Sequence, residues 1–170
     1  MPEIEYVEDR MESEELLERL CPPVRNWFKD KFPDFTEPQK VAIPRILNGE
    51  HLLLCSPTGS GKTLTAFLTI IDDLVRRSLD GSLPDAVQCV YISPIKALAN
   101  DIEKNLMGPL GEIKERYLPS RAKEIKVGLR TGDTPQSERE KMLRKPPHIL
   151  ITTPESLGLG LSLIHISEPT

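Results

Sequence analysis

The stretch that decides the fold is Ser56-Pro57-Thr58-Gly59-Ser60-Gly61-Lys62-Thr63. The apolar run His51–Cys55 precedes it, and Thr63–Arg77, whose apolar residues recur with helical spacing, follows it. A glycine-rich turn between a buried strand and a helix lets backbone N–H groups and the positive end of the helix dipole surround a phosphate. The stretch therefore predicts an α/β fold with a phosphate-binding loop at the carboxyl end of a strand.

Each residue type in this loop has a chemical reason. Gly59 and Gly61 let the backbone turn so that successive N–H groups face one anion. Lys62 supplies a positive charge for the β- and γ-phosphates of a nucleotide, and the Thr63 hydroxyl is placed to ligate Mg²⁺. Ser56 stands where the general pattern has glycine, which is a small departure. The predicted nucleotide contacts are Ser56, Pro57, Thr58, Gly59, Ser60, Gly61, Lys62 and Thr63; a glycine-rich turn without a nucleotide is the alternative.

Strands and helices alternate along the rest of the chain. Further strands are predicted over Val87–Ile92, Lys126–Arg130 and His148–Thr152. Helices are predicted after a Ser13 cap and up to Pro22-Pro23, over Val24–Phe32, over Pro38–Leu47 with Gly49 at its end, over Thr63–Arg77, from Ile95 with an interruption near Gly108-Pro109, over Pro135–Arg144 and from Pro154. This alternation predicts a P-loop parallel sheet with helices on both faces.

Composition narrows the class of protein. The chain has 170 residues, 38% of them hydrophobic and 28% charged, which predicts a folded chain of about one domain. No apolar run approaches the ~18 residues of a membrane span, and the N-terminus lacks a basic leader, so no membrane partner is expected. Cys21, Cys55 and Cys89 are sparse and odd in number, which favours a reducing, cytoplasmic location.

Charge is distributed unevenly. Residues 1–20 carry eight acids and two bases, whereas residues 114–145 carry ten bases and five acids. The acidic segment 1–20 is expected to be an extension with one short helix, followed by the domain proper from residue 21. A basic stretch is compatible with nucleic-acid binding, although it is more commonly just a solvated face.

A second candidate element lies upstream of the loop, at Phe35-Thr36-Glu37-Pro38-Gln39. Thr36 and Gln39 have the spacing of a capping box, so a purely structural role is one alternative. The other is recognition of a base, because the Gln39 amide offers one donor group and one acceptor to an adenine edge.

Three predicted strands are each followed by Ser, Thr or Gly beside a proline at a helix start. Each such start could be a plain N-cap, or could present N–H groups and a hydroxyl to a phosphate of a nucleic-acid backbone. Three in succession favour the second interpretation. The predicted nucleic-acid contacts are Ser93, Pro94, Lys96, Thr131, Gly132, Asp133, Thr153, Pro154 and Glu155.

Three segments, Tyr91–Ile102, Arg130–Arg139 and Lys145–Leu157, resemble superfamily 2 helicases of the large helicase-related family. The resemblance runs from about Phe32 to Leu157. It implies the N-terminal part of a first RecA-like domain in an ATP- and Mg²⁺-dependent enzyme that moves 3′ to 5′ on single-stranded DNA and acts in repair. It further implies that Phe35 and Gln39 read adenine and that Lys62 and Thr63 serve catalysis.

The same resemblance places the Asp-Glu-x-His box and the arginine finger outside residues 1–160, so the isolated segment is predicted to bind without hydrolysing. Leu161–Thr170 resembles a translated sequencing adapter, which predicts residues 21–160 as a truncated domain. A nucleotide- or nucleic-acid-binding remnant is one alternative function. Another is a different P-loop enzyme such as a small-molecule kinase, against which Gln39 and the three helix starts argue. Single-stranded or duplex DNA is the expected partner, with RNA or a hybrid left open.

Overall fold

The computed structural model describes residues 5–94 and 102–160. The helices are α1 (Ser13–Arg19), α2 (Pro22–Lys31), α3 (Glu37–Leu47), α4 (Lys62–Asp80), α6 (Gly108–Tyr117), α7 (Gln136–Arg144) and α8 (Pro154–Gly160), and the π-helical turn η1 (Glu103–Met107) leads into α6. The strands are β1 (Cys89–Ile92), β2 (Val127–Arg130) and β3 (Ile149–Thr152). The expected start of a helix at Ile95 and the adapter-like residues 161–170 lie outside the described residues.

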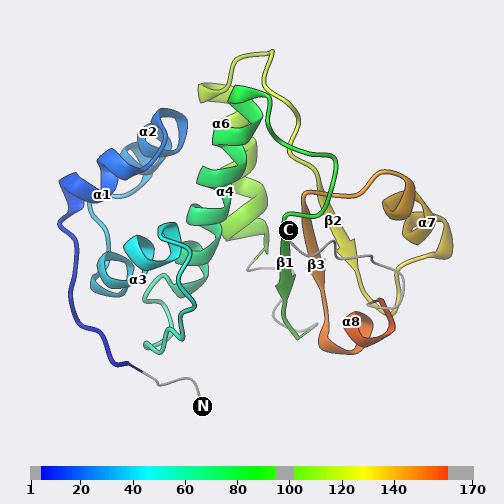
Figure 1. Ribbon diagram of the computed structural model, residues 1–170, viewed down its shortest axis with the longest axis horizontal. Helices are drawn as coiled ribbons and strands as arrows, with labels where there is room; N and C mark the ends of the chain where they lie inside the picture. Colours follow the sequence, from blue (N-terminus) through cyan, green and yellow to red (C-terminus); the bar gives the residue numbers. More distant parts are fainter. Residues whose placement is uncertain (1–4, 95–101, 161–170) are drawn as a thin grey trace.

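The strands form one parallel sheet in the order β1-β3-β2. Helices α4 and α6 lie on one side of this sheet and α7 and α8 on the other (Figure 1). The sheet covered on both faces is therefore confirmed. Because the strands are parallel, their carboxyl ends share one edge, where Ile92, Thr152 and Arg130 stand in register.

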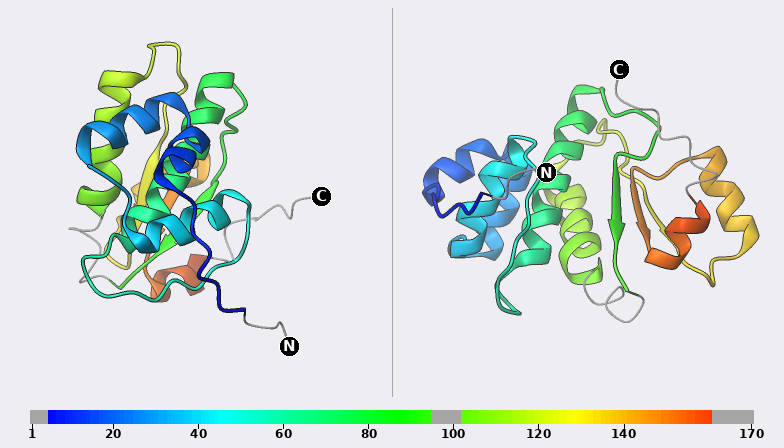
Figure 2. Two further views of the ribbon diagram at one scale, coloured as in Figure 1. Left: turned by 90° about the vertical axis from the view of Figure 1, so that its left-hand side faces the viewer. Right: turned by 60° about the horizontal axis from the view of Figure 1, so that its bottom comes forward.

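The N-terminal helices pack on the far side of α4 (Figure 2). The side chains of Leu16 in α1 and of Val24 in α2 are fully buried in the main core. The buried carboxylate of Asp72 in α4 accepts the backbone N–H of Cys21 at 2.6 Å and pairs with Arg76 at 2.8 Å. Residues 13–20, which form the short helix of the predicted acidic segment, thus share one core with the helix that follows the loop.

One predicted strand does not form. His51–Cys55 has no regular secondary structure and pairs with no strand among the described residues, and the Leu53 side chain is 82% exposed. An apolar run of this kind indicates a central strand, which needs a neighbour on each side to satisfy its backbone groups. The sheet of the described residues supplies no such neighbour, because β1 pairs with β3 only.

Helix boundaries differ in small ways from the predicted ones. Ser13 is the first residue of α1 and its hydroxyl donates to Asp34, so it does not cap the helix. Pro22-Pro23 opens α2 in addition to closing α1. At the expected interruption near Gly108-Pro109, the π-helical turn η1 ends and α6 begins, with Pro109 in the first turn of α6, where its missing N–H costs nothing. Of the helices in the described ranges, none combines the length and apolar character that a membrane crossing needs.

His148 makes the stability of the fold depend on pH. Its side chain is fully buried, and Nδ1 accepts the backbone N–H of Lys126 at 2.9 Å, so the folded state holds a neutral ring with its proton on Nε2. Burial, together with the charges of Lys126 and Lys123, lowers the pKa of His148 below the value near 6.5 of an unfolded histidine.

Below that unfolded pKa the unfolded chain binds more protons, so the free energy of unfolding should fall as the pH decreases. Urea titrations of the chain at about pH 7.5 and about pH 5.5 measure this difference. His148→Gln, which does not titrate, should flatten it. An unchanged pH dependence in the variant would assign the effect to other groups.

Candidate nucleotide-binding site and nucleic-acid interface

The predicted turn is present between residue 55 and α4. Gly59 and Gly61 have φ values of +80° and +84°, a conformation that glycine alone adopts without strain. Among the described residues, only glycines have positive φ. Gly61 is the N-cap residue of α4, so the turn delivers its backbone N–H groups to the positive end of a long helix dipole. This is the geometry that binding of a phosphate requires.

Lys62 folds back onto the turn. Its Nζ donates to the carbonyl oxygens of Ser56 and of Pro57, the latter at 2.8 Å. The hydroxyls of Ser56 and Ser60 lie 2.6 Å apart and hydrogen-bond across the turn. These contacts hold the ammonium group at the loop, where it can exchange a carbonyl oxygen for a phosphate oxygen.

Lys62 and Thr63 line a groove of about 480 Å³ between the segment 50–54, the first turns of α4, and Tyr91 of β1. The Thr63 hydroxyl makes no hydrogen bond to any other described residue. Within residues 5–94 and 102–160, no cluster of three or more His, Cys, Asp or Glu side chains could hold a metal ion. The role of the Thr63 hydroxyl as a Mg²⁺ ligand stays a prediction.

Gln39 lies against the turn. Its Oε1 accepts the backbone N–H of Thr36 at 2.9 Å, which gives the capping box at the start of α3. The Thr36 hydroxyl donates to the carbonyl oxygen of Ser60 at 2.9 Å. A Cβ built on Gly61 would stand only 2.7 Å from Nε2 of Gln39. Gln39 thus caps α3 through Oε1 and also lies next to the loop. Its Nε2 remains available as a hydrogen-bond donor at the edge of the turn.

Phe35, predicted to contact adenine, belongs to the core. Its side chain is 4% exposed, and its ring stacks on Phe28 with centroids 4.1 Å apart and planes 13° apart. Phe35 packs at the start of α3, and recognition of a base stays a prediction for Gln39.

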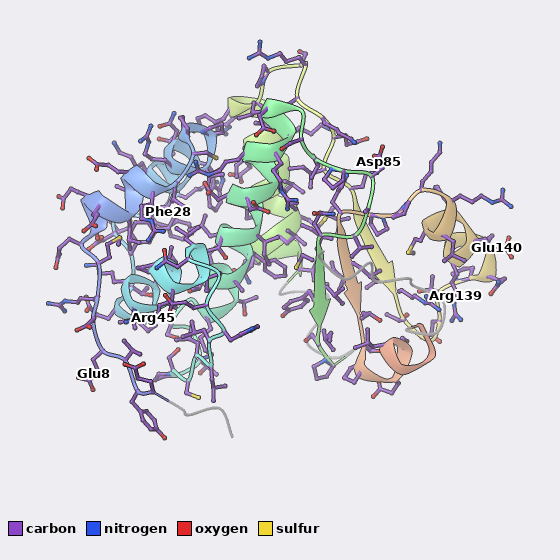
Figure 3. All side chains as sticks on the ribbon, viewed as in Figure 1. Glu8, Phe28, Arg45, Asp85, Arg139 and Glu140 are labelled. Atoms are coloured by element: carbon purple, nitrogen blue, oxygen red, sulfur yellow. The ribbon has the colours of Figure 1, made fainter. Side chains whose placement is uncertain are left out.

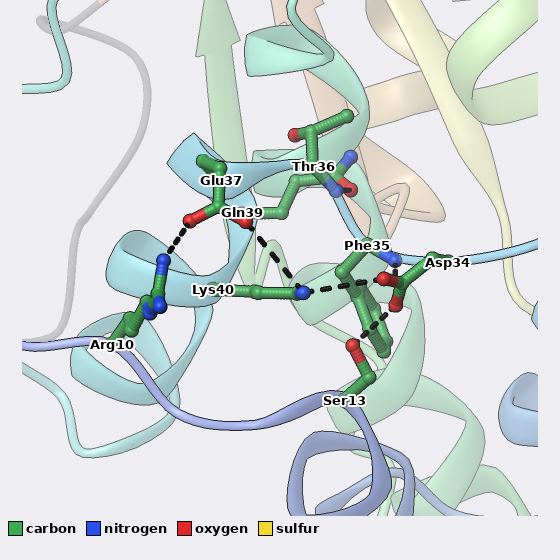
Figure 4. Close-up of polar contacts among 8 residues, drawn as sticks. All are labelled: Arg10, Ser13, Asp34, Phe35, Thr36, Glu37, Gln39 and Lys40. Atoms are coloured by element: carbon green, nitrogen blue, oxygen red, sulfur yellow. Dashed lines mark hydrogen bonds and ion pairs between the residues drawn. The ribbon is translucent and has the colours of Figure 1, made fainter.

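A chain of polar contacts anchors the start of α3 to the N-terminal segment (Figure 4). Lys40 pairs with Asp34 at 3.2 Å and with Glu37 at 3.7 Å, and Glu37 accepts from Arg10 at 2.7 Å. Hydrogen bonds from the Ser13 hydroxyl, from Lys40 and from the Phe35 N–H lower the pKa of Asp34, and the Asp34 carboxylate raises the pKa of Lys40. These contacts join residues 10–13 to the segment that carries Gln39. No short sequence motif predicts these contacts.

The sheet edge brings three of the predicted helix starts together. Ile92, Thr152 and Arg130 stand in register, so Ser93, Thr153 and Thr131 follow one another across the edge, with adjacent strands about 4.8 Å apart. Gly132, Asp133, Pro94, Pro154 and Glu155 are exposed around this row. Lys96 lies outside the described residues.

The hydroxyl groups in this row are less available than predicted. Thr153 is 1% exposed, and its Oγ1 accepts the N–H of Ser156 at 3.4 Å as an N-cap of α8. Ser93 is buried too, and its N–H continues the ladder to the carbonyl oxygen of Thr152 at 3.1 Å. Thr153 therefore acts as a helix N-cap, and Ser93 extends the hydrogen bonding of the sheet. Contacts to a nucleic-acid backbone stay a prediction for the exposed residues of the row.

Sequence reasoning overlooked Arg139 of α7. Its guanidinium donates to the carbonyl oxygens of Thr134 at 2.9 Å, of Thr131 at 3.2 Å and of Gly132 at 2.9 Å. In Figure 3 the labelled Arg139 projects from α7. An arginine within a few residues of a Thr-Gly-Asp turn is a weak signal for such a clamp, because the spacing alone does not say where the side chain points. Arg139 fixes the shape of the loop that carries Thr131, Gly132 and Asp133.

Comparison with known proteins decides the family. The sequence model of the DEAD/DEAH box helicases matches residues 36–166. The chain belongs to this family. Within the helicases, the chain is 48% identical over 170 residues to "ATP-dependent helicase Lhr-Core" of Methanocaldococcus jannaschii, covering 99% of the chain and 20% of that protein. It is 56% identical to the Lhr-Core helicase of Methanothermobacter thermautotrophicus over 84% of the chain and 17% of that protein.

Solved helicase structures agree with the fold. The Mycobacterium smegmatis helicase Lhr bound to ssDNA and AMP-PNP has 44% sequence identity and a TM-score of 0.73, with 86% of this chain and 18% of that chain covered. Mss116p bound to ssRNA and AMP-PNP, at 24% identity and a TM-score of 0.66, shares the fold. The resemblance to large helicase-related proteins and the RecA-like sheet are thereby confirmed. The chain spans about a fifth of the length of the curated helicases that it matches.

Proposed function

We propose that the chain forms the ATP-binding part of the first RecA-like domain of an ATP-dependent helicase that moves on DNA, with residues 21–160 as the partial domain. One observation carries the proposal. The phosphate loop and the candidate adenine reader are in contact, since a Cβ on Gly61 would lie 2.7 Å from Nε2 of Gln39. A base and the phosphates of one nucleotide can therefore be read by a single continuous surface.

The residues of the phosphate loop have separate roles in binding the nucleotide. Backbone N–H groups from Gly59 to Thr63, at the start of α4, surround the phosphates. Lys62 exchanges its loop carbonyl contacts for the β- and γ-phosphate oxygens. The Thr63 hydroxyl would hold a Mg²⁺ ion that is bound to the nucleotide, and that ion would supply neutralisation of the developing charge. The residues that activate water are supplied from outside residues 1–160, so this chain alone binds ATP without turnover.

DNA is the proposed partner at the sheet edge, and repair the proposed process. The support is the row of exposed residues after β1, β2 and β3, together with a 44% identical helicase that was solved with ssDNA. RNA or a hybrid is the competing partner. Free thiols at Cys21, Cys55 and Cys89 support a cytoplasmic location.

Nucleotide selectivity tests the proposal. In the complete protein that carries this segment, ATP should be hydrolysed with a kcat/KM about tenfold to a hundredfold above that for GTP, because an amide that donates and accepts discriminates the adenine edge by about that factor. Gln39→Glu keeps the oxygen that caps Thr36 but removes the Nε2 donor, so the variant should lose most of the preference while the KM for GTP stays unchanged.

The assay is phosphate release with oligodeoxythymidylate, oligouridylate or no nucleic acid. Stimulation by the DNA oligomer beyond that by the RNA oligomer supports DNA as the partner. Equal use of ATP and GTP by the unmodified protein would favour a different P-loop enzyme. Binding of ATP without any turnover would favour a nucleotide-binding remnant.

A further inference from the structure

Asp34 connects three parts of the chain at the start of α3 (Figure 4). Its carboxylate accepts hydrogen bonds from the Ser13 hydroxyl, from the Phe35 backbone N–H at 2.7 Å and from Nζ of Lys40 at 3.2 Å. Ser13 belongs to α1, Phe35 lies just before the N-cap of α3, and Lys40 lies in the first turn of that helix. One carboxylate therefore ties both the approach to α3 and its first turn to α1.

A strap of N-terminal residues, 9–13, lies along the same helix. The backbone N–H of Met11 donates to the carbonyl oxygen of Lys40 at 3.1 Å, and the Met11 side chain packs against the main core. Arg45, in the last turn of α3, donates to the carbonyl oxygen of Asp9 at 3.0 Å. The strap thus contacts α3 at its first turn and at its last turn.

The ammonium group of Lys40 depends on Asp34. The Lys40 side chain is 12% exposed, whereas that of Asp34 is 53% exposed. Among the described residues, the other carboxylate that pairs with Lys40 is that of Glu37, at 3.7 Å. An ammonium group with so little access to water needs a close anionic partner. Loss of the Asp34 carboxylate leaves Lys40 with the longer contact alone, which favours a shift of Lys40 and of the turn that carries it.

The same first turn carries Gln39, the candidate adenine reader. The Gln39 side chain is 3% exposed, and its Oε1 accepts the Thr36 N–H at 2.9 Å. Its Nε2 lies where a Cβ on Gly61 would be 2.7 Å away, and the Thr36 hydroxyl donates to the carbonyl oxygen of Ser60 at 2.9 Å. The position of this turn therefore sets the position of Nε2 relative to the phosphate loop. A donor that must meet one atom of a base tolerates an error of only about 0.5 Å.

We propose that Asp34 is a positioning residue for base recognition, which together with the strap 9–13 fixes the first turn of α3 and thereby the Nε2 donor of Gln39. The inference rests on the proposed function, since it needs Gln39 to read adenine. Asp34 acts only through Gln39 and is assigned no contact with the nucleotide. The acidic N-terminal segment thereby gains a role in nucleotide selectivity, in addition to the helix that it contributes to the core.

Steady-state kinetics of the complete protein that carries this segment, with ATP and with GTP as substrates, test the proposal. Asp34→Ala should raise the KM for ATP about threefold to tenfold, the cost of ordering a side chain that is no longer held in place. The kcat for ATP and the KM for GTP should stay within about twofold, because the phosphate loop is unchanged and the guanine edge does not match the Gln39 amide. Asp34→Asn, whose amide oxygen still accepts hydrogen bonds, should recover part of the selectivity.

Glu112→Ala is the matched control. The Glu112 carboxylate also joins two helices, since it accepts Nε1–H of Trp27 at 2.8 Å and pairs with Lys31 at 2.9 Å. These contacts connect α2 with α6 and do not involve α3. The control variant should lower the melting temperature about as much as Asp34→Ala does, because each change removes a carboxylate that accepts hydrogen bonds. It should leave the ratio of the two KM values unchanged.

A double variant shows whether Asp34 acts through Gln39. Gln39→Glu alone should remove most of the preference for ATP, and adding Asp34→Ala should cause no further loss. An intact preference in Asp34→Ala, an equal loss in Glu112→Ala or an additive loss in the double variant would each overturn the positioning role. If Gln39→Glu keeps the preference, or if the unmodified protein uses ATP and GTP equally, base recognition by Gln39 fails, and the proposed function fails before the positioning role is reached.

Discussion

Replacing Lys62 by alanine should reduce ATP turnover of the complete protein by on the order of 10²–10³-fold, the loss seen when a preorganised charge or donor at a reacting group is removed. Lys62 is the cation that contacts the turn, through the carbonyl oxygens of Ser56 and Pro57. No other described lysine or arginine side chain lies in the groove that Lys62 shares with Thr63. Phosphate release under saturating single-stranded DNA measures the effect.

Binding of the DNA oligomer should stay within about twofold in Lys62→Ala, because the sheet edge lies after β1, β2 and β3 and does not include the loop. Undiminished turnover in Lys62→Ala would remove the lysine from the catalytic role that the family resemblance implies.

Replacing Gly61 by alanine should cost far more than the same change at Gly59. Both glycines have φ near +80°, so each alanine pays about 1–2 kcal/mol for the left-handed backbone. At Gly59 the new methyl group meets nothing within 4 Å, whereas at Gly61 it meets Nε2 of Gln39 at 2.7 Å. Gln39 is 3% exposed and its Oε1 caps Thr36, so it cannot move aside without breaking that bond.

The extra cost at Gly61 should be about 1–3 kcal/mol of unfolding free energy, the usual range for overpacking, with loss of measurable ATP binding. Urea titration and nucleotide titration of the two variants provide the comparison. Adding Gln39→Ala to Gly61→Ala should recover part of the stability, because the clashing amide is gone. Strict additivity of the two changes would show that the clash between the introduced methyl group and the Gln39 amide carries no energy.

Local patterns predicted the turns and helices well, because their causes are local. The two glycines and the helix after them require only neighbouring residues, and α3 began with the capping box that Thr36 and Gln39 predicted. Pairing of strands is different. His51–Cys55 has the composition of a central strand, yet a strand forms only when another lies beside it, and that information is not contained in its own five residues.

In the candidate site, too, features with a local cause could be predicted and features that depend on the fold could not. Gln39 could be singled out because an amide just upstream of a phosphate loop has the donor and the acceptor that reading an adenine edge requires. Phe35 could not be assigned to the core from its position, since only the fold brings Phe28 against its ring. The clamp formed by Arg139 depends on the direction in which one side chain points, and composition does not contain that information.

The hydrogen bond between the Cys21 N–H and Asp72 spans 51 residues, and it has a consequence for biosynthesis. At about 5–20 residues per second, a ribosome needs several seconds to add the intervening chain after Cys21 emerges. During that time the apolar faces of α1 and α2 have no α4 to cover them. The N-terminal helices are therefore the part of this chain that a nascent-chain chaperone would meet first.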